Sequence, residues 1–241
     1  MPLIETEAVV LNTLKLGEAD KLVTFYTRNF GKVKAVAKGA RKLKNKFGSS
    51  LEPFSRSHLV VYDKNSRFLY RLFQSDMIES FQKLRSDYEK ILYTSRFLTC
   101  LEALTPEGDP SPLIYDLLLK FLDSLKGERI GARSIHLYKL KLLGYSGYEF
   151  SLDRCLKCQN SGTENRLSPL AGGMICSACA LSDPSRSFPV SQPALAVLRQ
   201  TFKMGHDLIP RIKPSGEVIL EIAHILDVFI FHLLGKKLPS I

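Results

Sequence analysis

Four cysteines in two Cys-x2-Cys pairs constrain this chain more than any other feature. They are Cys155 and Cys158, followed after residues 159–175 by Cys176 and Cys179. Each pair can form a tight turn that directs two sulfurs at one point, and two such turns can close a tetrahedral sulfur cage, which suits Zn²⁺. Because the protein would fill all four ligand positions, we expect one structural Zn²⁺ per chain and no metal position open for catalysis.

A pair of disulfides is the alternative interpretation of these cysteines. Residues 1–7 lack the basic region and the long apolar core of a secretion signal, and cytosolic thiols stay reduced, so metal binding is favoured. The longest apolar stretch, Val218 to Leu234, is interrupted by acidic residues and histidines and predicts an amphipathic helix rather than a membrane span. We therefore expect a soluble, cytoplasmic protein without a membrane partner.

Positive charge is concentrated near the amino terminus. The formal net charge is +10, and residues 1–75 hold 14 Lys and Arg against 6 Asp and Glu. The segment from residue 28 to residue 46 contains no acidic residue, and its cations are Arg28, Lys32, Lys34, Lys38, Arg41, Lys42, Lys44 and Lys46. A local patch of this kind predicts attraction to a polyanion, and nucleic acid is the polyanion that we expect.

Residues 3 to about 75 have the pattern of short β-strands, rich in β-branched and aromatic residues. Within residues 32–38 the side chains alternate, and one face carries the apolar residues Val33, Ala35 and Ala37. The other face then carries Lys32, Lys34 and Lys38. About five short strands in this length, with one basic face, predict a small β-barrel of the OB-fold type.

From about Asp76 the apolar period becomes helical. Ser111-Pro112 is a helix start, since the serine can cap and the proline fits the first turn, and Gly144 is a predicted helix stop. Two further helices are expected near 193–204 and 216–234. The fold class is therefore α+β: an OB-fold barrel over residues 1–77, then an α-helical domain over residues 78–241 that carries the zinc-binding insertion at about 150–182.

Enzyme motifs are not apparent. The chain has neither a Gly-rich phosphate loop nor a His-Glu-x-x-His motif, and we expect no catalytic residues. A metal-dependent nuclease is one alternative, because four acidic residues near the amino terminus could form a metal site: Glu5, Glu7, Glu18 and Asp20. It is disfavoured because carboxylates in turns more often accept backbone amide hydrogens or pair with lysines.

The cationic patch suits binding to nucleic acid without sequence preference. Lys and Arg side chains on a barrel face can follow a phosphate backbone, and an aromatic ring beside them can stack on unpaired bases. Phe47 is the best stacking candidate because it lies in the basic loop, whereas Phe30, Phe68 and Tyr70 are more simply explained as core residues. The predicted DNA-binding residues are the eight cations of the patch and Phe47.

Several motifs, taken in order, resemble those of the bacterial RecO family of DNA repair proteins. The amino-terminal ones are Gly17-Glu18-Ala19-Asp20-Lys21-Leu22-Val23, Ala37-Lys38-Gly39-Ala40-Arg41 and Leu51-Glu52-Pro53-Phe54. The later ones are the segments 139–145, 152–158 and 168–179, the last two of which include the four cysteines. Their order and spacing extend the resemblance over essentially the whole chain.

The resemblance implies a DNA repair and recombination mediator that consumes no nucleotide. Proteins of this family bind single- and double-stranded DNA, anneal complementary strands and, with RecR, help to load RecA on DNA coated by single-strand-binding protein, whose C-terminal tail they recognise. It also implies that the four cysteines are zinc ligands and that the protein works at the nucleoid in the cytoplasm. The remaining alternative is a zinc-containing protein-interaction adaptor whose charge is incidental.

Overall fold

The computed structural model describes residues 3–63, 69–127, 133–160, 165–181 and 187–239. The chain forms two compact units, residues 1–128 and residues 129–241. The predicted order, a five-stranded barrel followed by a helical region that carries the four cysteines, is confirmed. None of the helices in the described ranges is both long and apolar enough to cross a lipid bilayer.

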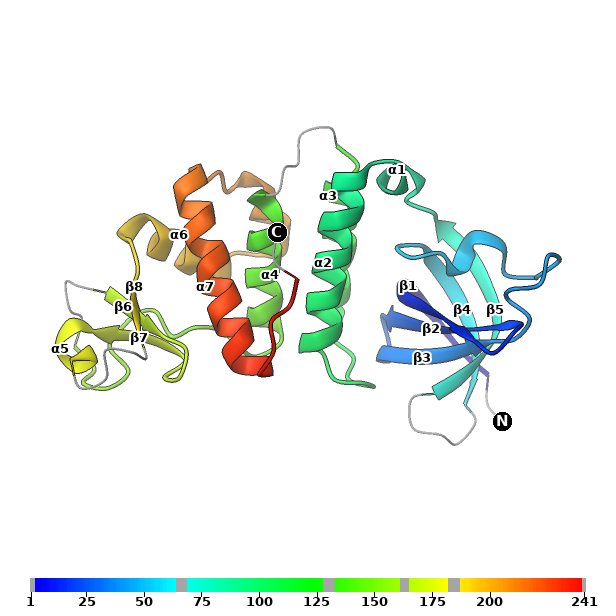
Figure 1. The fold of residues 1–241 in the computed structure, drawn as a ribbon, viewed down its shortest axis with the longest axis horizontal. Helices are drawn as coiled ribbons and strands as arrows, with labels where there is room; N and C mark the ends of the chain where they lie inside the picture. The colour runs from blue at the N-terminus through cyan, green and yellow to red at the C-terminus, as the bar shows by residue number, and fades with distance from the viewer. Residues whose placement is uncertain (1–2, 64–68, 128–132, 161–164, 182–186, 240–241) are drawn as a thin grey trace. The chain divides into compact units, whose positions relative to one another are not determined.

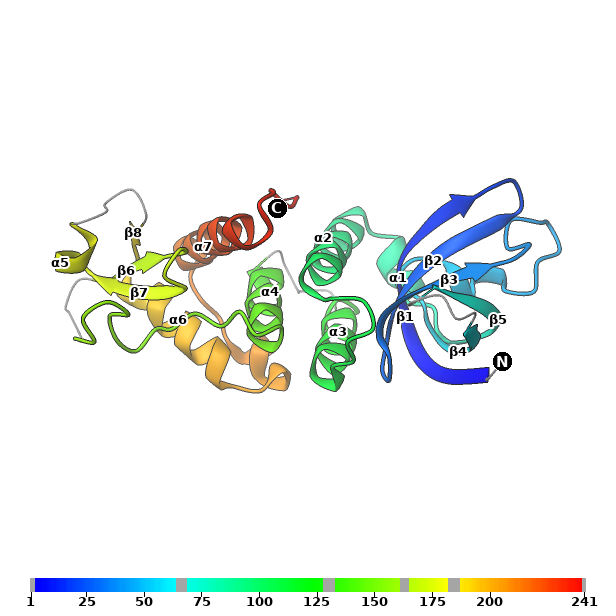
Figure 2. The ribbon, with the colours of Figure 1, turned by 90° about the horizontal axis from the view of Figure 1, so that it is seen from below.

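The first unit begins with a closed β-barrel (Figures 1 and 2). Its strand order is β1-β2-β3-β5-β4, in which β3 and β5 run parallel and the other neighbours run antiparallel. This connectivity is that of an OB-fold barrel. The strands are β1 (Leu3–Leu16), β2 (Asp20–Thr27), β3 (Gly31–Ala37), β4 (Arg56–Asp63) and β5 (Leu69–Glu79).

The barrel interior is filled by one face of each strand. The predicted alternation in β3 is confirmed, since Val33, Ala35 and Ala37 are buried in the barrel core. Phe25 from β2 and Leu72 from β5 join the same core. Burying such side chains away from water is the main favourable contribution to folding, at roughly 2 kcal/mol for each large one.

Helices complete the first unit. After the short 3-10 helix η1 (Gly48–Leu51), the chain forms β4 and β5 and then α1 (Gln82–Arg85), α2 (Tyr88–Leu104) and α3 (Pro112–Ser124). The predicted cap is confirmed, because the Ser111 hydroxyl accepts a hydrogen bond from the Ile114 amide at the start of α3. Asp87 caps α2 in the same way through the Lys90 amide.

The second unit combines helices with a small sheet. Its helical elements are α4 (Arg133–Tyr145), α5 (Ser177–Ala180), α6 (Gln192–Lys203), the 3-10 helix η3 (His206–Arg211) and α7 (Gly216–Leu234). Strands β6 (Asn165–Ser168), β7 (Gly173–Cys176) and β8 (Phe188–Pro189) form a sheet in the order β7-β6-β8. Helix α4 packs against α6 and α7.

One predicted helix stop is wrong. Gly144 lies inside α4, which ends at Tyr145, so it is not the C-terminal residue in a left-handed conformation. A Cβ atom at this position would come 3.1 Å from the Phe202 ring of α6, and glycine therefore permits close helix packing. The left-handed residue after the helix is Gly147, with φ of 84°.

The compact units divide the chain later than the predicted boundary after residue 77. Strand β5 ends at Glu79, and the first unit also includes α1, α2 and α3. Contacts between the β2–β3 turn and the segment that joins α2 to α3, described below, explain why these helices group with the barrel. The assignment of separate domains at residues 1–77 and 78–241 stays a prediction.

Candidate nucleic-acid interface and metal centre

Five of the predicted cations lie in the connection between β3 and η1, residues 38–46, which we call the cationic loop. They are Lys38, Arg41, Lys42, Lys44 and Lys46, and all five are exposed. None of them forms an ion pair with an acidic side chain among the residues that the structure describes. The loop therefore presents positive charge to solvent that no described carboxylate neutralises.

The backbone of the cationic loop is held by contacts with the β1–β2 turn. The Gly39 amide donates to Oδ1 of Asp20 at 2.8 Å, and the Arg41 amide donates to the Ala19 carbonyl at 2.9 Å. Nη1 of Arg41 also donates to the Gly17 carbonyl at 2.8 Å. Asp20, which the sequence offered as a nuclease ligand, thus helps to hold the backbone of the cationic loop against the β1–β2 turn.

Phe47 is not an exposed stacking residue. Its side chain is only 5% exposed and belongs to the barrel core, so the predicted contact with bases is wrong in this conformation. The Asn45 side chain accepts hydrogen bonds from the Phe47 and Gly48 amides, which turns the chain inward. Phe47 therefore anchors the end of the cationic loop by hydrophobic burial.

Lys32 is not on the exposed face that the strand alternation predicted for it. It is 8% exposed, and its ammonium donates to the carbonyls of Glu102 and Thr105 at the C-terminal end of α2. Burial lowers its pKa from the ordinary value, although the nearby Glu102 and Glu107 oppose that change. Lys32 satisfies helix-terminal carbonyls and is not available to a phosphate.

Two further predicted cations are paired within the same unit. Nζ of Lys34 lies 2.5 Å from a Glu107 carboxylate oxygen, and Nη1 of Arg28 lies 3.6 Å from an Asp116 oxygen. Both cations keep part of their side-chain surface, 40% for Lys34 and 47% for Arg28. We call Arg28, Lys32 and Lys34 the anchored cations, because acids or carbonyls of the helical segment hold each of them.

The β2–β3 turn approaches this helical segment closely. Gly31 has φ of 63°, and a Cβ atom there would lie 2.1 Å from the Asp109 carbonyl oxygen. The Gly108 amide donates to the Lys32 carbonyl at 2.9 Å. Glycine is required here both by the left-handed backbone and by the contact. The turn and the anchored cations together fix residues 105–116 onto the barrel.

An exposed aromatic ring does occur beside the cationic loop, but on a residue that was not predicted. Phe73 of β5 is 43% exposed, and its ring meets that of Tyr62 of β4 edge-on, with centroids 5.5 Å apart and planes at 78°. Nζ of Lys46 lies 4.6 Å from the Phe73 centroid and 5.3 Å from that of Phe47. Of the other aromatic residues that the sequence offered as stacking candidates, Phe68 lies outside the described residues.

Sequence reasoning missed Phe73, which lies at a β-bulge. Val60 pairs with Gln74 whereas Val61 pairs with Leu72, so the register between β4 and β5 shifts there and Phe73 has no direct partner. Leu72 is buried and Phe73 points outward. A Leu-Phe pair in a strand gives no signal of which member is exposed, and a bulge can be located only once the partner strand is known.

The four predicted metal ligands converge in the second unit. Their sulfurs all lie within 4.8 Å of one another, and the Sγ atoms of Cys158 and Cys176 are 3.7 Å apart. A tetrahedral ion with metal–sulfur distances of about 2.3 Å requires neighbouring sulfurs about 3.8 Å apart. None of the four is in a disulfide. The cluster could therefore hold one metal ion, and it is the only such group among the described residues.

Backbone hydrogen bonds shape the first cysteine turn. The Cys155 amide donates to the Asn160 carbonyl at 3.0 Å, and the Gln159 amide donates to the Cys155 carbonyl at 2.8 Å. Gln159 adopts a left-handed backbone with φ of 62°. The second pair lies at the end of β7 and in α5, and the Leu156 amide joins the two parts by donating to the Met174 carbonyl of β7.

Close contact between the four sulfurs drives the pKa values of the thiols apart. Burial opposes ionisation of Cys155, but backbone amides of Cys158, Cys176 and Lys157 around its sulfur lower its pKa to about 6. Contacts with the sulfurs of Cys176 and Cys158 raise the pKa of Cys179 to about 12. Four adjacent thiolates repel one another unless a bound cation offsets their charge, which is the chemistry of a metal–thiolate centre.

The acidic residues of the nuclease alternative do not converge. The Glu7 carboxylate accepts a hydrogen bond from Arg56 at 2.6 Å, which lowers its pKa, and Asp20 holds the Gly39 amide. Glu5 and Glu7 lie in the first half of β1, whereas Asp20 pairs with Leu16 at its far end. These four acids therefore form no common metal site.

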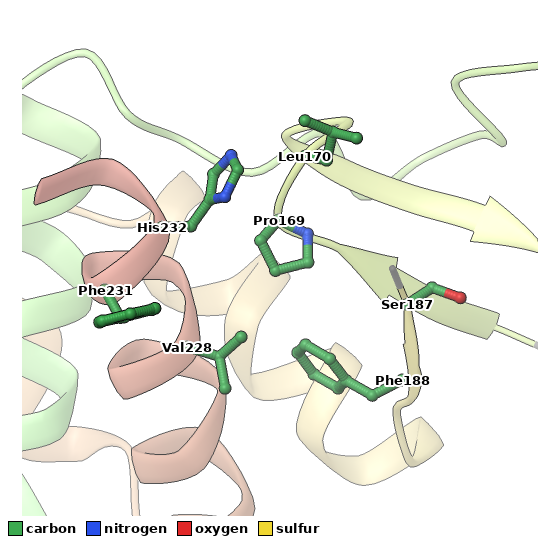
Figure 3. Close-up of a pocket in the computed structure, with 7 residues that line it drawn as sticks. All are labelled: Pro169, Leu170, Ser187, Phe188, Val228, Phe231 and His232. Atoms are coloured by element: carbon green, nitrogen blue, oxygen red, sulfur yellow. The ribbon is translucent and has the colours of Figure 1, made fainter. Parts of the chain in front are cut away.

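An open pocket of about 510 Å³ lies in the second unit. Figure 3 shows Val228, Phe231 and His232 of α7 on one side and Pro169 and Phe188 on the other. Leu170 and Ser187 complete the lining. The lining contains no Lys or Arg and is largely apolar, so this pocket is not a site for a phosphate backbone.

Family models and curated relatives match along the chain. The model described as "Recombination protein O N terminal" matches residues 1–81, and "Recombination protein O C terminal" matches residues 85–241. A protein of Clostridium novyi named "DNA repair protein RecO" is 33% identical over 244 residues, which cover 100% of this chain and 93% of that protein.

Two further relatives carry the same name. That of Syntrophus aciditrophicus is 31% identical over 241 residues, covering 98% of this chain and 93% of the relative. That of Alkaliphilus metalliredigens is 34% identical over 208 residues, covering 86% of this chain and 82% of the relative. The two family models thus extend over the barrel and over the helical region in which the four cysteines lie.

Proposed function

The chain belongs to the recombination protein O family, which implies a role in DNA repair and recombination, and on that premise we propose that it binds DNA through the cationic loop and anneals complementary strands. The observation that carries the proposal is the exposure of Lys38, Arg41, Lys42, Lys44 and Lys46 on one anchored loop without described acidic partners. The substrates are single- and double-stranded DNA, and the reaction has no covalent step.

Annealing has a simple physical basis in this proposal. Two DNA strands repel each other, and a cationic surface lowers that repulsion while it holds the strands close together. Release of condensed counterions supplies much of the binding free energy, so affinity falls steeply with salt. Because phosphates carry no sequence information, the protein accepts strands of any sequence.

The proposed partners are RecR and the C-terminal tail of single-strand-binding protein, and the proposed outcome is loading of RecA on DNA coated by single-strand-binding protein. A protein contact of this kind tethers the mediator to coated DNA and raises the effective concentration of the DNA near the cationic loop. The work takes place at the nucleoid in the cytoplasm.

Salt dependence tests the proposal directly. We expect the logarithm of the association constant for a duplex to fall with the logarithm of salt concentration with a slope of about −4 or steeper, because each of the five proposed phosphate contacts contributes about −0.9. The same protein should accelerate annealing of complementary oligonucleotides. Absence of binding at low salt would favour the adaptor alternative, and cleavage of labelled DNA with Mg²⁺ that Glu18→Ala removes would favour the nuclease.

The metal is proposed to be Zn²⁺, held by Cys155, Cys158, Cys176 and Cys179 as a structural ion. Such an ion ties the two cysteine pairs together and contributes directly to folding free energy. Protein purified without chelator should contain about one Zn²⁺ per chain, and Cys176→Ser should lower the thermal unfolding midpoint. Cys100→Ser, in a buried cysteine outside the cluster, is the control that should keep the metal. Substoichiometric zinc in the wild type would contradict this assignment.

A further inference from the structure

The exterior of the barrel beside the cationic loop carries an aromatic pair that the proposed phosphate contacts leave unexplained. Phe73 is 43% exposed although it lies within a strand, and Tyr62 meets it edge-on. We call these two side chains the aromatic platform. An apolar ring exposed to this degree is not accounted for by core packing.

The ring points outward because Phe73 follows the inward-facing Leu72 in the strand, and a β-bulge leaves it without a direct partner. Leu72 fills the barrel core, and the register shift opposite Val60 and Val61 leaves Phe73 as the extra residue of β5. Tyr62 then limits the orientation of the Phe73 ring by an edge-on contact, which is a favoured geometry for an aromatic pair. The platform is therefore an ordered surface on two paired strands.

Lys46 connects this platform to the cationic loop. Its ammonium lies 4.6 Å from the Phe73 centroid, and Lys46 is itself exposed at the end of the loop. A ring that can stack on a base and a cation that can bind the adjoining phosphate thus lie next to each other. This is the combination that single-stranded nucleic-acid sites use.

We propose that Phe73, oriented by Tyr62, stacks on an unpaired nucleobase while Lys46 binds an adjacent phosphate, and that this contact makes the protein prefer unpaired over paired DNA. The inference rests on the proposed function, because it requires that DNA binds at the cationic loop. It adds what phosphate contacts cannot supply, since phosphates are present in single and double strands alike.

The preference follows from the accessibility of base faces. In a duplex each base face is covered by the neighbouring pair, so Phe73 reaches none without unstacking. In a single strand a base can turn outward onto the ring at little cost. Lys46 would leave the Phe73 face and move to a phosphate, and this exchange is favourable because base stacking on an aromatic ring exceeds an exposed cation–π contact in free energy.

Substitution of Phe73 separates stacking from charge. Phe73→Leu keeps an apolar side chain but removes the aromatic face, and Tyr88→Leu is the matched control at an aromatic residue that is 77% exposed at the start of α2. We expect Phe73→Leu to weaken binding of an oligothymidine about 5- to 30-fold and to change binding of a duplex of equal length less than twofold. Tyr88→Leu should change neither.

A second variant reports the contact directly. The chain contains no Trp, so Phe73→Trp introduces a single indole at the platform. Its fluorescence should be quenched by the oligothymidine, and an abasic oligonucleotide of equal length should leave it unchanged. Oligothymidine affinity in this variant should equal or exceed that of the wild type.

The outcomes separate the inference from the proposed function. If Phe73→Leu weakens single and double strands equally or not at all, or if the abasic strand quenches the Trp as strongly as the oligothymidine, the stacking inference is wrong while salt-dependent DNA binding can still stand. If the wild type binds neither DNA, both proposals fail. If Phe73→Leu loses affinity only for the oligothymidine, and if quenching of the Trp requires bases, the proposed stacking on the aromatic platform is supported.

Discussion

The anchored cations and the cationic loop are consecutive in the sequence, yet they serve opposite purposes. Lys32 donates to the end of α2, and Lys34 and Arg28 pair with Glu107 and Asp116. The five cations from Lys38 to Lys46 are exposed instead, with no described acidic partner. The comparison teaches that a run of positive charge in a sequence does not identify a ligand-binding surface, because part of the run can be used to assemble the fold.

The difference arises from what each part faces. Strand β3 begins at the side of the barrel where residues 105–116 pack, and the Lys32–Glu107 bridge and the Gly108 amide join them. The cationic loop instead follows the other end of β3 and is held by the β1–β2 turn. Carboxylates and backbone carbonyls of a segment distant in sequence thus hold the first part of the run, and the second part stays exposed.

Removal of the loop charges should have the largest effect. Replacing Lys38, Arg41, Lys42 and Lys44 with Ala should lower DNA affinity about 100- to 1,000-fold at low salt and make the salt slope shallower by up to about 3.6, because each lost phosphate contact removes about 0.9 from the slope. Fluorescence anisotropy with labelled DNA measures both quantities. Thermal unfolding should stay close to that of the wild type.

A matched pair of double variants sharpens this prediction. One double variant combines Lys42→Ala with Lys44→Ala in the cationic loop. The other combines Arg28→Ala with Lys34→Ala among the anchored cations, and each variant loses two positive charges. We expect the loop variant to weaken DNA binding more, since Glu107 and Asp116 already neutralise Lys34 and Arg28. Equal losses would show that net charge alone sets the affinity and would remove the distinction between the two regions.

Among the substitutions in the anchored region, Gly31→Ala should destabilise the fold most. The added methyl would lie 2.1 Å from the Asp109 carbonyl oxygen, on a backbone with φ of 63°, so the segment 105–116 must move. We expect a loss of about 3 kcal/mol in the free energy of unfolding, measured by urea denaturation. Gly17→Ala is the control, because it has a similar φ of 59° but no atom within 4 Å; it should cost only about 1 kcal/mol of backbone strain.

Lys32→Met should destabilise the protein by about 2 kcal/mol, since the Glu102 and Thr105 carbonyls would lose their buried donor. Methionine retains most of the apolar volume of the lysine side chain. DNA affinity of the folded variant should change less than twofold, which anisotropy at a temperature well below the unfolding midpoint can measure. A large loss of affinity without a loss of stability would return Lys32 to the DNA-binding surface.

The smallest expected effect is a pH dependence of the contribution that Lys32 makes to the free energy of unfolding. Burial lowers the pKa of Lys32 below its ordinary value of 10.5. Between the folded-state pKa and 10.5 the unfolded chain binds more protons at this site, so the stability contributed by Lys32 rises with pH in that interval. The gap in unfolding free energy between wild type and Lys32→Met should therefore widen as the pH approaches 10.5. A constant gap in urea denaturation at several pH values would contradict the assigned pKa shift.

Local patterns predicted the architecture well. Alternation identified the buried face of β3, the serine and proline before α3 marked its start, and the spacing of the four cysteines predicted a convergent sulfur cluster. Each of these sequence patterns depends only on residues within one strand, one helix start or one turn. The same local reasoning failed at Phe47, where an inward turn of the chain buried a side chain that was expected to be exposed.

The sequence by itself determined a barrel, a helical region, a four-cysteine cluster and an excess of positive charge, because periodicity and ligand spacing are written along the chain. Only the tertiary structure decided which cations and which ring are available to a ligand. The Lys32 ammonium meets a carbonyl 70 residues away in the sequence, and Phe73 lies unpaired where β4 and β5 shift register. Contacts between segments so far apart depend on packing, which no local pattern encodes.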